Sequence, residues 1–198
     1  MSASDTDNIG LESAIDQIIA LNERICRFWT KEASGWAPRE AATLLENSRM
    51  DRLVSLSHSL RLWTQPCPDE DQEGRLILAW ANLGILVEGT MTWFVCVYER
   101  SYSQSPMKTK QGFDLEPNRL RFEELIRLFR EHVWTPQQVP EWDSWLTMVR
   151  NCRNAVHAFN HREIGTWSDW SASVIRYHDL IGELDSRVPY PDASDYYG

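Results

Sequence analysis

The 198 residues, 42% hydrophobic and 25% charged, suffice for one domain with a sizeable core and exclude a mainly disordered chain. The formal net charge of −9 argues against a large basic surface, and so against a DNA-binding module, but it permits a small basic cleft on an acidic body. Four cysteines without a C-x-x-C pair, and a polar, acidic start unlike a signal peptide, predict a reduced, cytoplasmic protein.

Helical periodicity dominates the chain, and strict apolar/polar alternation nowhere competes with it. Helices are expected, in chain order, over residues 9–31, 38–46, 50–63, 75–101, 117–132, 141–159 and 166–187. The polar linker over 103–116 is the segment best suited to be a mobile loop. The sequence therefore predicts an all-α bundle of about five to seven helices. It forms a single domain over 1–188, followed by a flexible C-terminal tail over 189–198.

The apolar run over residues 76–98 is long enough to cross a bilayer. It contains Asn82, Glu88 and two glycines, however, and no clusters of Lys and Arg flank it. A helix that is apolar all round is also typical of the centre of a helical bundle. We therefore expect the central helix of the fold here, and no membrane span.

The helix expected over residues 141–159 carries the residues most suited to chemistry. On a helical wheel one apolar face collects Trp142, Trp145, Leu146, Val149, Cys152, Val156 and Phe159. An arc of about 100° beside that face collects Arg150, Arg153, Asn154 and His157. Arginine offers a fork of donors to phosphate oxygens, and histidine can move a proton near neutral pH. Glu88, in the apolar run, is expected either to orient Arg150 or Arg153 or to face a solvated gap.

The string Arg150-Asn-Cys-Arg-Asn-Ala-Val-His157 resembles the signature of HEPN domains, in which four to six residues separate an Arg from a His. Six residues intervene here, and the polar Asn151 follows the Arg directly. The resemblance implies a HEPN-like bundle that forms a homodimer, with one composite, metal-independent ribonuclease site and no cofactor. Arg150 would stabilise charge on the scissile phosphate of RNA, and His157 would act as base or acid for attack by the 2′-hydroxyl. Asn151, Arg153, Asn154 and Glu88 would support this pair.

The setting implied by the same resemblance is a toxin or effector in bacterial stress or phage defence. Such a nuclease would need a restraining regulatory or antitoxin protein. Phe159 stands where some toxins of the family carry a tyrosine, so regulation through a modified tyrosine is not expected.

The same residues also allow structural interpretations without catalysis. In the alternative interpretation the polar arc is a helix edge held in salt bridges. The chain is then a non-catalytic HEPN-like interaction module or neutralising partner whose acidic surface binds a basic protein. His157 and His161 have a spacing that suits zinc, but no Asp or Glu completes a known pattern, so no metal site is expected. Four tryptophans either stack RNA bases or serve the core or a dimer seam: Trp142, Trp145, Trp167 and Trp170.

Overall fold

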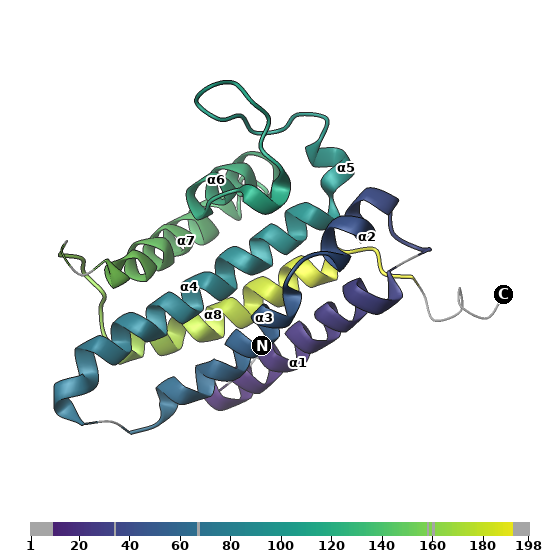
Figure 1. Ribbon diagram of the computed structural model, residues 1–198. Coiled ribbons are helices and arrows are strands. Elements are labelled where there is room, and N and C mark those ends of the chain that lie inside the picture. The colour runs from purple at the N-terminus through teal and green to yellow at the C-terminus, as the bar shows by residue number, and fades with distance from the viewer. Residues whose placement is uncertain (1–9, 34, 67, 158, 160, 192–198) are drawn as a thin grey trace, which may run out of the picture.

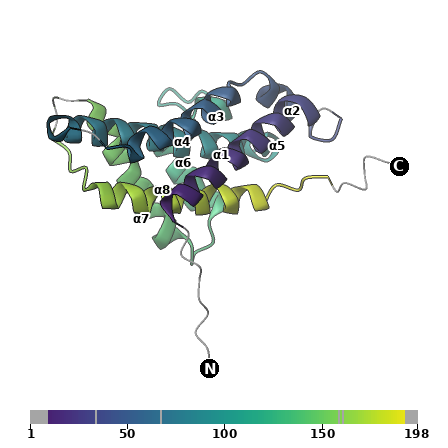
Figure 2. The ribbon, with the colours of Figure 1, turned by 90° about the horizontal axis from the view of Figure 1, so that it is seen from below.

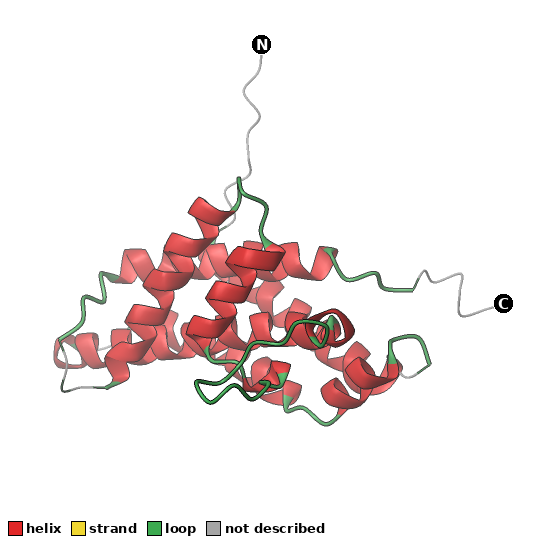
Figure 3. Ribbon diagram, turned by 90° about the horizontal axis from the view of Figure 1, so that it is seen from above, coloured by secondary structure: helices red, strands yellow, loops and turns green. Residues whose placement is uncertain are grey.

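The computed structural model describes residues 10–33, 35–66, 68–157, 159 and 161–191. Within these residues it contains eight α-helices and no strand, which confirms the all-α prediction (Figure 3). The count exceeds the expected range because the helix predicted over 75–101 breaks at Tyr98, whose φ of −98° and ψ of 29° are not helical. A short separate helix, α5 (Glu99–Tyr102), follows the break.

Helix α4 (Gln72–Val97) lies at the centre of the bundle (Figure 1). Its side chains are buried almost all round, as the continuous apolar run of the sequence predicts. Helices α3 (Met50–Ser59) and α8 (Trp167–Ser186) pack along one side of it, and α1 (Leu11–Arg27) packs in turn on both of these helices. On the other side lie α6 (Phe122–Leu128) and α7 (Val139–Arg153), while α2 (Arg39–Glu46) covers one end.

One helix, which spans Asp69–Val97 when its first turn is included, is long and apolar enough to cross a membrane. Within the fold, 61% of an apolar 18-residue stretch of this helix is buried. Burial of this kind is what the central helix of a bundle requires.

Helices α1 and α8 lie side by side, and a buried hydrogen-bond network joins both of them to α4 (Figure 2). The Tyr177 hydroxyl lies 2.9 Å from Thr90 Oγ1 and accepts from Asn22 Nδ2 at 3.5 Å. Because each of these polar groups has a hydrogen-bond partner, the network can join three helices inside an apolar core without a large desolvation cost.

The core extends two residues beyond the domain boundary predicted at 188. The Tyr190 ring packs edge-on against Phe28, with centroids 4.9 Å apart, and stacks on Trp36. Its hydroxyl donates to Asp185 at 2.8 Å. The predicted tail therefore begins too early, and the rest of it, 192–198, lies outside the described residues.

The linker expected to be a mobile loop folds into a small hairpin. An isolated bridge pairs Lys108 with Asp114, and Leu115 N–H donates to the Met107 carbonyl at 2.8 Å. Gly112, with φ of +87°, makes the turn, a conformation that glycine adopts without strain. Tyr102 ties the hairpin to α5 by donating to the Leu115 carbonyl at 2.8 Å. The hairpin thus has a defined position beside α6.

Candidate functional site

Helix α7 carries the first half of the Arg–His motif but ends earlier than predicted. It begins at Val139, with Pro140 in its first turn, and runs only to Arg153. A 3₁₀ turn, Asn154–Val156, follows, and His157 leaves the helix with ψ of 78°. The prediction of one helix to residue 159 is therefore wrong. The predicted apolar face is buried as far as Cys152, but Val156 is 46% exposed and Phe159 is fully exposed.

The early end of α7 has a cause outside the helix. The indole N–H of Trp80, on α4, donates to the carbonyl of Ile164 at 2.7 Å. The Cys152 thiol also points at the Glu163 carbonyl, with a sulfur–oxygen distance of 3.7 Å. These contacts draw the segment after α7 back towards the core, so the helix cannot continue in a straight line.

The structure brings Glu88, Arg153 and Asn154 together. Arg153 Nη2 donates to Glu88 Oε2 at 2.7 Å, across the contact between α7 and α4. Arg153 Nη1 donates to Asn154 Oδ1 at 3.3 Å. The Glu88 and Arg153 side chains are 21% and 32% exposed, so the pair is partly shielded from water. Of the two arginines that the sequence offered to Glu88, Arg153 is the partner.

Arg150 points the other way, towards α6. Its Nη1 lies 3.3 Å from Glu123 Oε2, and its side chain is 27% exposed while that of Glu123 is 82% exposed. The Nε–H of Arg150 is buried and has no hydrogen-bond partner within the described structure. Arg150 and Arg153, predicted to share one arc, are thus held by different carboxylates on different helices.

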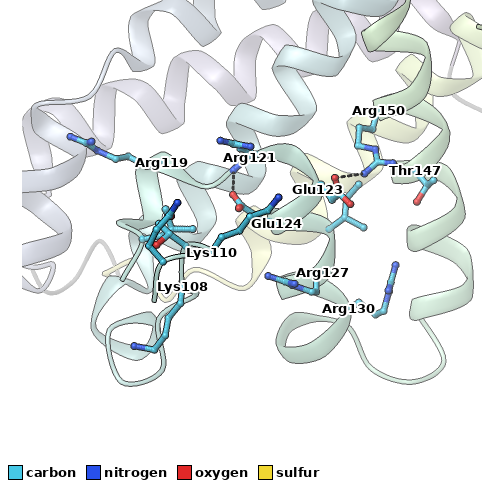
Figure 4. Close-up of a pocket in the computed structure, with 14 residues that line it drawn as sticks. Lys108, Lys110, Arg119, Arg121, Glu123, Glu124, Arg127, Arg130, Thr147 and Arg150 are labelled. Carbon is cyan, nitrogen blue, oxygen red and sulfur yellow. Dashed lines mark hydrogen bonds and ion pairs between the residues drawn. The ribbon is translucent and has the colours of Figure 1, made fainter. Parts of the chain in front are cut away.

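Arg150 lines a groove of about 1180 Å³ between the hairpin, α6 and α7, which we call the basic groove (Figure 4). Its walls carry seven basic side chains and two acidic ones, Glu123 and Glu124. The basic residues are Lys108, Lys110, Arg119, Arg121, Arg127, Arg130 and Arg150. On a chain with a net charge of −9, this is a local concentration of positive charge.

Four of these seven cations already have a carboxylate. Besides the Arg150–Glu123 pair, Arg130 binds Asp143 through two hydrogen bonds, of 2.8 and 2.9 Å. Lys108 pairs with Asp114 at 2.6 Å and Arg119 with Glu116 at 2.9 Å. The other three, in the part of the chain that the structure describes, have no ion-pair partner: Lys110, Arg121 and Arg127.

His157 and Asn151 are not among the residues that line the basic groove. Both side chains are exposed, and neither makes a hydrogen bond or ion pair to another described residue. His161 pairs with Glu163 at 2.9 Å. Among the described residues, no group of three His, Cys, Asp or Glu side chains is arranged to hold a metal ion. Among the described residues Arg150 pairs with Glu123, and no hydrogen bond or ion pair joins Arg150 to His157.

Most of the tryptophans named as candidates for base stacking are buried in the core. Trp142, Trp145 and Trp170 are at most 7% exposed. The guanidinium of Arg176 covers the ring of Trp142, with its carbon 5.1 Å from the ring centroid. Trp167 is half-buried and donates to Gln72 at 2.8 Å. Trp142, Trp145 and Trp170 therefore belong to the core and are closed to bases, whereas Trp167 keeps part of its ring exposed.

Sequence analysis missed most of the basic groove. Its cations come from three segments that only the fold brings side by side, and the net charge of −9 conceals them. A charge count over short windows would have marked residues 119–130, where four arginines follow one another within a few turns.

Comparison with protein-family models, with curated proteins and with solved structures gave no match. The class of protein that the fold defines is an all-α helical bundle. The HEPN resemblance rests on the Arg150–His157 motif and on its place on a late helix, after a long apolar one, in a helical bundle.

Proposed function

We propose that the protein is a metal-independent endoribonuclease of the HEPN type. The observation that carries the proposal is the position of Arg150, which lines a groove of seven basic side chains on an otherwise acidic protein. Cations gathered in this way favour a phosphate-bearing ligand. RNA is the phosphate polymer that an Arg/His pair can cut without a metal, because its own 2′-hydroxyl supplies the nucleophile.

In this proposal Arg150 stabilises the charge that develops on the scissile phosphate. His157 accepts the proton of the attacking 2′-hydroxyl or donates one to the leaving 5′-oxygen, so the products are a cyclic phosphate and a 5′-hydroxyl. As the HEPN resemblance implies, the site is composite and a homodimer completes it, with each copy contributing Arg150 and His157. The exposed apolar side chains of Val156 and Phe159, on either side of His157, are suited to burial by a second copy.

The setting that belongs with this proposal is a cytoplasmic toxin or effector of stress or phage defence, restrained by a regulatory or antitoxin protein. An unrestrained ribonuclease would damage its own cell. Expression of the intact chain in bacteria is expected to arrest growth, and the Arg150→Ala chain is expected to be tolerated at the same protein level.

A specific observation favours a second candidate, a non-catalytic interaction module. Arg150 and Arg153 each pair with a separate carboxylate, Glu123 and Glu88, as a structural helix edge would. In this alternative the acidic body binds a basic protein partner, and the motif only stabilises the fold.

Cleavage of a labelled mixed-sequence RNA in EDTA separates the two candidates. Wild type is expected to cut, and Arg150→Ala and His157→Ala are each expected to lose about 100-fold or more in rate. His161→Ala is the matched control, since His161 is an exposed histidine four residues from His157 and is expected to keep full activity. Circular dichroism checks that each variant folds. Equal cutting by every variant, or no cutting by a folded dimer, would remove the nuclease proposal.

A further inference from the structure

The lining of the basic groove suits a long, flexible anion better than a small molecule. Pockets for small ligands have volumes of about 300–1000 Å³ and mostly apolar and aromatic walls. Here the volume is about 1180 Å³. Among the described residues that line the walls none is aromatic, and Leu115 and Ile126 are the two apolar ones. A small ligand would bury little apolar surface in such a groove, so binding must come from charge.

The three unpaired cations supply that charge. Lys110, Arg121 and Arg127 are exposed, and they come from the hairpin, the residue before α6 and α6 itself (Figure 4). They repel one another and the four paired cations around them, and a bound anion would relieve this repulsion. A polymer with regularly spaced negative charges can meet cations on all three segments at once.

We infer that the basic groove holds the phosphate backbone of a single RNA strand and contacts its phosphates without reading its bases. The choice of RNA among phosphate polymers rests on the proposed function, whereas the preference for a polyanion rests on the groove alone. The absence of aromatic side chains from the lining removes base stacking, which is the usual source of base contacts to single strands.

Glu123 competes with this strand for Arg150. Its carboxylate occupies one guanidinium nitrogen at 3.3 Å, while its side chain is 82% exposed. An exposed ion pair of this kind contributes little, and a phosphate that accepts two hydrogen bonds from the same guanidinium replaces it. Glu123 therefore limits the affinity of the groove and holds Arg150 in place when the groove is empty.

Fluorescence anisotropy tests the groove with a labelled oligouridylate of about 20 nucleotides, on the full chain carrying His157→Ala to prevent cleavage. The affinity is expected to fall with salt along a logarithmic slope of about −3, as four phosphate contacts to a single strand predict, one from Arg150 and one from each of the three unpaired cations. Arg127→Glu and Lys110→Glu are each expected to weaken binding about tenfold and to flatten the slope by about 0.7, the value of one phosphate contact to a single strand.

Arg52→Glu is the matched control, because Arg52 is an exposed arginine on α3, away from the groove, and its reversal changes the net charge equally. It is expected to change the affinity less than about twofold. An effect of Arg52→Glu as large as that of Arg127→Glu would overturn the groove as the site. Glu123→Gln is expected to tighten binding about three- to fivefold, and Glu131→Gln, an exposed neighbour that does not line the groove, is expected to leave it unchanged.

Competitors identify the chemistry of the ligand. Oligoadenylate, single-stranded DNA and inorganic polyphosphate of equal charge are expected to displace the probe equally well. Displacement by uridine monophosphate at equal phosphate concentration, or stronger displacement by polyglutamate, would overturn the RNA strand as the ligand. If the chain with His157 intact binds RNA but does not cut it, the nuclease proposal is overturned and the groove stands as the binding site. If it cuts RNA and Arg127→Glu and Lys110→Glu do not change the rate, the groove is overturned and the nuclease proposal stands.

Discussion

Gly84 on α4 lies directly against Arg153 on α7. A Cβ atom at residue 84 would lie 2.4 Å from Cβ of Arg153 and 2.5 Å from its Cγ. These atoms are close to the backbone and cannot swing away. The missing side chain therefore sets how closely the two helices approach, and it places Arg153 within reach of Glu88, one turn further along α4.

Gly84→Ala is expected to destabilise the protein by about 1–3 kcal/mol, because α7 must move away from α4. Gly182→Ala is the matched control, since Gly182 lies in α8 with open space where its Cβ would go. That change is expected to stabilise the fold by about 0.5–1 kcal/mol, as alanine does in a helix. Thermal unfolding followed by circular dichroism measures both, and equal effects of the two substitutions would contradict the close contact.

The Glu88–Arg153 pair is expected to couple α4 to α7. Glu88→Gln and Arg153→Met should each destabilise the protein by about 1–3 kcal/mol, since each leaves a partly buried charge without its partner. The double variant is expected to be more stable than the sum of the single losses predicts. Urea unfolding of the four chains gives the coupling energy, and strictly additive losses would show that the pair contributes nothing as a pair.

The sequence predicted the order of the helices and the central place of α4, because a long apolar run has no stable position except inside a bundle. It predicted the end of α7 wrongly. Local periodicity continues past Arg153, but the bond from Trp80 to the Ile164 carbonyl links residues 84 positions apart and bends the chain. No local pattern contains that information.

The candidate site, too, could be predicted from the sequence only in part. Glu88 was identified because a carboxylate in an apolar helix needs a partner, and this rule depends on one residue and its surroundings. The partner of Arg150, Glu123, sits on another helix, and nothing in the spacing of the motif indicates it. His157 lies beyond the end of α7, the helix that carries Arg150, and the spacing of the motif does not indicate this break.

The hydroxyl of Tyr177 is expected to be worth about 1–3 kcal/mol of stability, because Tyr177→Phe leaves buried polar groups on Thr90 and Asn22 without this partner. Burial also raises the pKa of Tyr177, since the phenolate would lose its water. Tyr98→Phe serves as the comparison, because the Tyr98 hydroxyl bonds to the Arg187 carbonyl in a half-buried position. A smaller loss is expected there in urea unfolding, and the reverse order would contradict the network.

Two buried thiols predict an alkaline limit to stability. Burial raises the pKa of Cys96 to about 12 and that of Cys152 to about 11, and nearby Glu99 and Asp169 respectively add to the shift. The folded chain thus keeps protons that the unfolded chain releases at a pH of about 8.5. This stabilisation is complete below the unfolded pKa and is lost as the pH rises through the folded pKa values. Urea midpoints are expected to fall over this alkaline range, and less so in Cys96→Ala.

The same thiols are expected to be unreactive in the native protein. In a Cys67→Ser chain at about pH 8, Cys26, which is only partly buried, should react first with a thiol reagent. Cys96 and Cys152 should react only after denaturant is added. Rapid native modification of either would show that the surrounding helices open readily.

The central position of α4 also has a consequence for synthesis. Trp80, Leu83, Leu86 and Val87 are completely buried in the finished fold, yet α6, α7 and α8 are translated after them. While the ribosome adds those later helices, the faces of α4 that they cover in the finished fold are still exposed in the nascent chain. Chaperones that bind apolar segments should therefore associate with the nascent chain at this stage of translation. Chains that stop before α8 should aggregate.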